Sequence, residues 1–304
     1  MRRASVITFA VGLTVMILGM AKVVEGGLLL GMLLGFAGAV CFGLSFIRRP
    51  DARPDAPPAL PLVSRVVEVF TGSTRVFTEL HARPRWLAAL LIIAASGFAY
   101  NVVFTIRVTP EVITAAGMNK AVEAGIISPE RAAQVMEVQV ASARSIVGRV
   151  SDGVGQFIAA LFVMMVLAGL YWGGVRLFGG RINFWAALCV AIYASLPPVV
   201  INNLLSIFLL YVKSPDEIDP IRDQQGLLRD NLGVLFSPSS QPILYTAASF
   251  VGVLTLYRLW LTARGLRHAG ERVSAEAAWA ISLGLWGTGL LLGLAWVALF
   301  PSMA

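Results

Sequence analysis

Charged residues are scarce in this chain of 304 residues. Asp, Glu, Lys and Arg together make up 13% of it, whereas soluble globular chains carry about 25%. Hydrophobic residues make up 57% of the sequence, and the mean hydropathy is +0.78. A single soluble core cannot bury that much apolar surface. The composition therefore excludes a soluble enzyme, a disulfide-stabilised secreted domain and a soluble nucleic-acid-binding protein.

Cysteine and histidine are scarce as well, at two residues each. Cys41 and Cys189 lie within apolar stretches, which is typical of buried free thiols rather than of a disulfide or a metal site. His81 and His268 lie outside those stretches, and no carboxylate falls deep within one. The apolar stretches contain no HExxH motif and no aspartate pair of the kind that intramembrane proteases use. The sequence therefore predicts no catalytic centre, no metal site and no cofactor, and it disfavours ion-coupled transport.

Long hydrophobic runs are what the sequence has in abundance. Uncharged runs of 18 or more residues predict helices that cross a membrane. Seven such runs occur, at residues 4–21, 26–47, 86–106, 153–175, 183–212, 238–257 and 277–300. We expect an all-α polytopic membrane protein with seven spans. Residues 1–21 also resemble a signal peptide that ends in Gly19-Met20-Ala21, but a retained helix is favoured because the apolar stretch is long.

The basic residues predict the orientation of these spans. If the N-terminus lies in the cytoplasm, 15 of the 24 Lys and Arg residues fall in inner loops, and 11 of the 17 acidic residues fall outside. Inner loops of membrane proteins are rich in Lys and Arg. We therefore expect a cytoplasmic N-terminus and an external C-terminus. The net charge of +7 thus reflects membrane topology, and no nucleic-acid partner is expected.

Pro-rich and amphipathic segments divide the chain into domains. Residues 1–47 form a predicted transmembrane hairpin, residues 48–60 a cytoplasmic Pro-rich linker, and residues 61–304 the main domain. Residues 61–82 have helical periodicity and are predicted to lie in the inner interface, with a possible break at Gly72-Ser73. The apolar face contains Leu62, Val66, Val69, Phe70, Val76, Phe77 and Leu80, and the polar face Arg65, Glu68, Arg75 and Glu79.

Residues 107–152 form a predicted external segment, and residues 213–240 a second, acidic and irregular external loop. Ser128 and Pro129 predict a helix start, since serine caps helix N-termini and proline suits the first helical position. A helix that ran unbroken from there to residue 176 would far exceed the thickness of a bilayer. We therefore expect a break near Gly148, Gly153 and Gly155.

Polar residues cluster in the run at 183–212, together with two prolines. They are Tyr193, Ser195, Pro197, Pro198, Asn202 and Asn203. Consecutive prolines free backbone carbonyls and kink a helix. One interpretation is a broken-helix site for a small ligand or a lipid headgroup. The favoured alternative is that these side chains hydrogen-bond to neighbouring helices beside a structural kink.

Two further patterns suggest interaction surfaces. Small residues recur at every fourth position, at Gly27, Gly31, Gly35, Ala39 and Gly43. Such a stripe lets helices approach closely, either within the chain, which is the favoured reading, or in a homo-oligomer. Basic residues in predicted inner loops could bind lipid headgroups or an acidic partner, or could serve topology alone; they are Arg176, Arg181, Arg264, Arg267 and Arg272.

Several short stretches from about Arg65 to the end resemble the Yip family of multi-span membrane proteins, in its bacterial form. They are Pro84-Arg85-Trp86-Leu87, Leu177-Phe178-Gly179-Gly180 with Phe184, Tyr193-Ala194-Ser195-Leu196-Pro197 and Leu256-Tyr257-Arg258-Leu259-Trp260. The resemblance implies five closely spaced spans, no known catalytic centre and a bacterial inner-membrane location. Eukaryotic relatives are associated with Rab-type GTPases, but their acidic-Leu-Tyr-Gly-Pro motif is missing here.

These observations favour a non-enzymatic integral membrane protein. The leading hypothesis is a Yip-like scaffold or adaptor that acts in membrane organisation or partner binding, with the lipid bilayer and a homo-oligomer or membrane-protein partner as its contacts. The alternative is a permease or binding protein for a small neutral solute or lipid, which would use the kinked run at 183–212.

Overall fold

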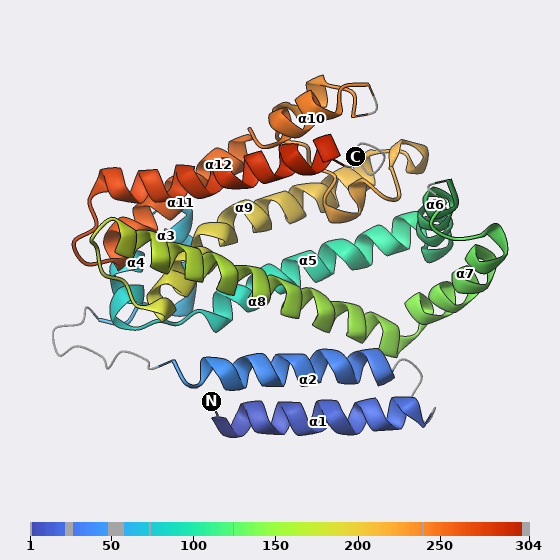
Figure 1. Ribbon diagram of the computed structural model, residues 1–304, viewed down its shortest axis with the longest axis horizontal. Coiled ribbons are helices and arrows are strands. Elements are labelled where there is room, and N and C mark those ends of the chain that lie inside the picture. Colours follow the sequence, from blue (N-terminus) through green and yellow to red (C-terminus); the bar gives the residue numbers. More distant parts are fainter. Residues whose placement is uncertain are drawn as a thin grey trace. The chain divides into compact units, whose positions relative to one another are not determined.

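The computed structural model describes residues 2–21, 27–47, 58–72, 74–123, 125–238 and 240–299 (Figure 1). These residues form α-helices joined by short loops and three brief 3₁₀ turns, and they contain no β-strand. The helices are α1 (Arg2–Met20), α2 (Gly27–Leu44), α3 (Leu62–Phe70), α4 (Thr74–Ala82), α5 (Leu87–Val108), α6 (Pro110–Glu123), α7 (Pro129–Arg144), α8 (Ile146–Leu177), α9 (Phe184–Val212), α10 (Pro242–Ser249), α11 (Val253–Ala269) and α12 (Ala275–Leu299).

Five of these helices are long and apolar enough to cross a membrane: α2, α5, α8, α9 and α12. The apolar part of α1, Ser5–Met20, is slightly shorter. Six of the seven predicted runs thus correspond to single helices. The expectation of an all-α polytopic membrane protein is confirmed. The linker predicted at residues 48–60 lies mostly outside the described residues.

The run predicted as a single span at residues 238–257 is instead divided between α10 and α11. Between these helices, Gly252 is extended and pairs with Asn231 in an isolated β-bridge. The carboxylate of Asp230 accepts a hydrogen bond of 2.7 Å from the backbone of Leu254. The prediction of one continuous helix was wrong because these contacts with the preceding loop end one helix and start the next.

The break predicted between residues 129 and 176 is confirmed, although it lies at Ser145 rather than at the nearby glycines. Ser145 is extended, and its hydroxyl accepts a hydrogen bond of 2.9 Å from the backbone of Gly148. The side chain therefore caps the start of α8. The predicted start of the preceding helix is confirmed too, since Ser128 caps α7 and Pro129 is its first residue.

Helices α1 and α2 lie antiparallel, side by side (Figure 1), and approach closely at glycines from both helices. A Cβ atom at Gly31 would collide with the backbone nitrogen of Met16, and one at Gly38 would lie 2.6 Å from that of Phe9. Among the described residues, nothing lies within 4 Å of the same position at Gly35 or Gly43. Part of the predicted small-residue stripe therefore packs within the chain, with Gly38 as an additional member.

Helices α3 and α4 are separated by a turn at Gly72, where φ is +65°, as the sequence predicted. Val69, Val76, Phe77 and Leu80 of the predicted apolar face are buried. The prediction for the polar face is wrong at Arg65 and Glu79, whose side chains are 3% and 1% exposed. They are buried because they pair with each other, as described below, whereas Leu62 of the predicted apolar face is exposed.

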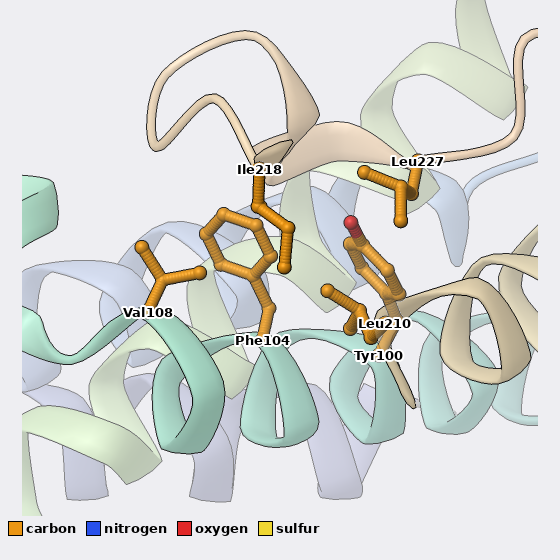
Figure 2. Close-up of a cluster of buried hydrophobic side chains, with 6 residues drawn as sticks. All are labelled: Tyr100, Phe104, Val108, Leu210, Ile218 and Leu227. Carbon is orange, nitrogen blue, oxygen red and sulfur yellow. The ribbon is translucent and has the colours of Figure 1, made fainter. Parts of the chain in front are cut away.

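The chain divides into two compact units. Unit 1 comprises Met1–Arg48, Phe98–Phe162 and Ile207–Leu227, and unit 2 comprises Arg49–Gly97, Val163–Ser206 and Leu228–Ala304. Figure 2 shows a hydrophobic cluster of unit 1, in which Ile218 and Leu227 of the loop after α9 contact the ends of two spans. The other members are Tyr100, Phe104, Val108 and Leu210. This cluster anchors a loop that the sequence suggests is merely acidic and irregular.

The core of unit 2 is the first half of α9. Every residue from Trp185 to Leu196 is buried. The ring of Trp185 stacks on that of Trp86 at a centroid distance of 6.5 Å. A helix that is apolar all round is typically enclosed by other elements, and here the enclosed part of α9 carries Tyr193 and Ser195.

Candidate functional site

A pocket of about 240 Å³ lies in unit 2 between the last turns of α11 and the first turns of α12. The α11 residues that line it are Trp260, Ala263, Arg264, Arg267 and His268, and the α12 residues are Ala275 and Trp279. We call it the basic pocket, since none of these seven lining residues is acidic. The pocket combines cationic side chains with two indole rings.

Arg264 is the central cation of the basic pocket. Its guanidinium lies 5.2 Å from the ring centroid of Trp260, within the range of a cation–π contact. Its Nε is buried and has no hydrogen-bond partner among the described residues. A buried donor without a partner is costly unless a ligand or water satisfies it. The Nε of Arg264 therefore provides an unused donor for an anion.

His268 completes the polar lining. Burial, and then the charges of Arg267 and Arg264, lower the pKa of its imidazole below the ordinary value of 6.5. Arg267 and His268 both lie in the last turn of α11, where the partial negative charge of the helix end stabilises cations. Although the helix end favours cations, burial and the two arginine charges together disfavour the protonated form of His268.

The wall of the basic pocket is fixed by the turn between α3 and α4. A Cβ atom at Gly72 would collide with the ring of Trp260, so the turn lies directly against the indole. Tyr257 stacks on Trp260 at a centroid distance of 6.0 Å, and its hydroxyl donates a hydrogen bond to the carbonyl of Phe70. The position of Trp260 thus depends on a glycine 188 residues earlier in the chain.

The end of α11 is held from a second side. The Nδ1 of His81 lies 2.6 Å from the carbonyl oxygen of Ala269, and its Nε2 lies 3.6 Å from the carboxylate of Glu271. Arg181 and Glu271 exchange two backbone hydrogen bonds of 2.9 and 2.7 Å. These contacts join the end of α4, the loop between α8 and α9 and the loop between α11 and α12, which the positive-inside rule assigns to one side of the membrane.

A buried ion pair lies in the same unit. Arg65 donates two hydrogen bonds of 2.9 Å to the carboxylate of Glu79 and a third, of 2.8 Å, to the carbonyl of Leu60. Burial alone would lower the pKa of Arg65, but hydrogen bonds to Glu79 and Tyr193 raise it above its ordinary value. The hydroxyl of Tyr193 donates to the carbonyl of Arg85 over 3.1 Å. The group therefore connects α3, α4 and α9.

Comparison with known proteins identifies the family. The model of the Yip1 domain matches residues 67–297, which is most of the chain. The chain belongs to the Yip1 family. No curated protein and no solved structure matches it. The matched residues include all seven that line the basic pocket, and they exclude α1 and α2.

The other predicted basic residues of the Yip1 domain lie apart from the basic pocket. Arg176 and Arg181 line a separate hollow of about 350 Å³ together with Gly179, Gly180 and Ile182. The guanidinium of Arg176 lies 4.1 Å from the ring centroid of Trp172. Arg272 has a φ of +56° and lines neither of these two pockets. Of the five predicted basic residues, Arg264 and Arg267 thus share the basic pocket, and Arg176 and Arg181 share the second hollow.

The predicted polar residues of α9 lie in a continuous helix, which includes Pro197 and Pro198. Ser195 and Asn203 are buried. The side-chain nitrogen of Asn203 donates to the hydroxyl of Ser96 over 2.9 Å, and the side-chain oxygen of Asn202 accepts from Ser206 over 3.0 Å. Asn203 thus bonds to a neighbouring helix, α5, whereas the bond of Asn202 lies within α9 itself.

Proposed function

We propose that this member of the Yip1 family is a non-enzymatic scaffold of a bacterial inner membrane, with its N-terminus in the cytoplasm and its C-terminus outside. It acts by binding anionic phospholipid headgroups in the basic pocket, on the side that its charges predict to be cytoplasmic. The observation that carries this proposal is the buried Nε of Arg264, which has no hydrogen-bond partner in the described part of the chain and belongs to a pocket with two indole rings and Arg267.

The chemistry of the pocket supports a phosphate ligand. Arginine presents several N–H donors in a planar fork that matches the oxygens of a phosphate group. Tryptophan side chains favour the headgroup level of a bilayer, because the indole is apolar while its N–H is polar. Basic residues next to membrane-spanning helices attract anionic lipids. Trp279 is 40% exposed, so one wall of the pocket is available to a lipid.

The test compares lipid binding by the purified protein and two variants. Phosphatidylglycerol added to the protein in neutral detergent should raise the midpoint of thermal unfolding. The variant Arg264→Gln should lose most of this shift, whereas Arg258→Gln, in the same helix but outside the pocket lining, should keep it. Equal shifts in both variants would refute headgroup binding at this pocket.

A scaffold must also hold other membrane components. Extraction of the full chain in a mild detergent should recover an oligomer or a copurifying membrane protein. A strictly monomeric protein without a partner, even in the presence of anionic lipid, would contradict the scaffold role.

The alternative of a permease for a small neutral solute or lipid has weaker support. It requires a water path to Asn202 and Asn203, whose side chains are engaged with Ser206 and Ser96. Single cysteines at these two positions distinguish the functions: a permease predicts labelling by water-soluble thiol reagents in intact membranes, whereas a scaffold predicts protection.

A further inference from the structure

A second pocket, of about 320 Å³, lies in unit 1 and plays no part in the proposed scaffold function. It is lined by residues of α5, by the junction of α5 and α6, by the end of α7 and by the start of α8. We call it the mixed-charge pocket. Its charged members are Glu111, Arg144, Arg149 and Asp152, and its uncharged members include Phe98, Asn101, Val102, Thr105 and Ile106.

Only part of this charge is neutralised within the protein. Glu111 and Arg144 form an ion pair of 2.5 Å. Arg149 donates a single long hydrogen bond, 3.4 Å from its Nε to the carbonyl of Ala143. Neither Arg149 nor Asp152 belongs to an ion pair among the described residues. One cation and one anion therefore remain for a ligand.

The remaining charges lie at a defined depth. Asp152 directly precedes the apolar run that begins at Gly153, so it stands at the boundary between hydrocarbon and headgroups. Arg149 and Asp152 are three residues apart in α8, which places their Cβ atoms about 5–6 Å apart. This spacing suits a ligand whose opposite charges are separated by a two-carbon unit.

The apolar side of the pocket suits a hydrocarbon chain. Ile106 is 72% exposed and Phe98 is 42% exposed. Both line the pocket from α5, eight residues and therefore about two turns apart. A chain lying along this stretch of α5 would continue from the charged end of the pocket into the hydrocarbon layer.

We propose that the mixed-charge pocket binds a zwitterionic phospholipid of the phosphatidylethanolamine class. The phosphate contacts Arg149, the ammonium contacts Asp152, and one acyl chain lies along Phe98, Val102 and Ile106. A soluble headgroup without acyl chains carries the same phosphate and ammonium groups. The exposed apolar strip and the position at the start of the apolar run both favour the intact lipid.

The experiment uses the full chain in neutral detergent and measures thermal midpoints and native mass spectra with three additives. They are phosphatidylethanolamine, phosphatidylglycerol and soluble glycerophosphoethanolamine. Phosphatidylethanolamine should bind and raise the midpoint. Asp152→Asn should weaken this binding roughly tenfold or more, since hydrogen bonds to charged groups are among the strongest. Arg149→Gln should weaken it similarly. The controls Arg131→Gln and Glu137→Gln change exposed charges of α7 outside the pocket and should have no effect.

The outcomes separate this proposal from that for the basic pocket. Asp152→Asn should leave the shift produced by phosphatidylglycerol intact, and Arg264→Gln should leave the shift produced by phosphatidylethanolamine intact. Unchanged affinity of Asp152→Asn for phosphatidylethanolamine would overturn the assignment. A shift of equal size with glycerophosphoethanolamine would overturn the lipid as the ligand.

Discussion

Arg65 and Glu79 form a two-pronged ion pair whose side chains are almost completely buried. Fourteen residues separate them, and the turn at Gly72 brings α3 and α4 together so that the two charges meet. The pair also reaches Tyr193 of α9. It therefore fixes two short helices, each too short to be stable alone, against the most buried helix of unit 2.

Glu79→Gln should destabilise the protein strongly, because it leaves the charge of Arg65 buried without a counter-ion. Breaking a buried pair at one partner costs about 3–5 kcal/mol. The matched control is Arg75→Gln, whose exposed side chain lies 4.0 Å from Glu68; exposed pairs contribute about 0–1 kcal/mol. Thermal unfolding in detergent measures both. The double variant Arg65→Met with Glu79→Leu should recover much of the loss, and equal midpoints for Glu79→Gln and Arg75→Gln would contradict the role of the pair.

Hydropathy predicts most of this fold because helices that cross a membrane must satisfy their backbone hydrogen bonds internally. It fails where a contact with residues elsewhere in the chain determines where a helix ends. The run at residues 238–257 is divided by Asn231 and Asp230, which pair with residues around Gly252. Helical periodicity predicts Arg65 and Glu79 on the polar face because it treats every charged residue as exposed. It takes no account of an oppositely charged partner that allows the residue to be buried. An arginine and a glutamate on facing helices of a hairpin were the available signal.

Only part of the lining of the basic pocket could be predicted from the sequence. Arg264 and Arg267 are predicted as basic residues of an inner loop, whereas in the structure α11 continues through both and places them on one face. Trp279 belongs to another helix, and the support of Trp260 by Gly72 depends on contacts that no spacing reveals. In the mixed-charge pocket, the sequence shows that Asp152 lies at the edge of an apolar run. It does not show that this residue shares a pocket with residues of α5.

Gly72→Ala should destabilise the protein and disturb the basic pocket. The glycine has a φ of +65°, which side chains disfavour, and a Cβ atom there would collide with Trp260. Strained backbone of this kind costs about 1–3 kcal/mol, before the displaced indole is counted. Gly117→Ala is the matched control, since no described residue lies within 4 Å of a Cβ atom at that position in α6. It should stabilise the protein slightly. A tolerated Gly72→Ala, with an unchanged response to phosphatidylglycerol, would be inconsistent with this packing.

Substitutions in α2 should separate packing within the chain from oligomer formation. Gly31→Leu should disrupt the hairpin, because its side chain would collide with the backbone of α1 near Met16. At Gly43 no described residue lies within 4 Å of an added Cβ atom, so Gly43→Leu should leave the hairpin intact. Protease sensitivity of α1 measures the first effect, and size-exclusion chromatography with light scattering measures the second. If Gly43→Leu alone converts an oligomer into a monomer, the open part of the stripe is the oligomer interface. Equal proteolysis of both variants would count against the close approach at Gly31.

His268 should make stability depend on pH. Its pKa is lowered in the folded protein by burial and by Arg267 and Arg264, so the unfolded chain binds a proton at a higher pH than the folded chain does. The contribution of His268 to the free energy of unfolding is therefore fully present above about pH 6.5, the ordinary pKa of histidine. It is lost progressively as the pH falls below that value. The thermal midpoint of the wild type should fall between pH 7.5 and pH 5, and that of His268→Asn should fall less.

Both proteins retain His81, which faces Glu271, so the difference between them reports on His268. Phosphatidylglycerol should reduce the fall of the wild-type thermal midpoint at low pH, because an anion among Arg264, Arg267 and His268 favours the protonated imidazole. Its phosphodiester does not titrate in this range, so the lipid itself contributes no change. Parallel pH profiles of the wild type and His268→Asn, with and without lipid, would show that His268 does not face the bound anion.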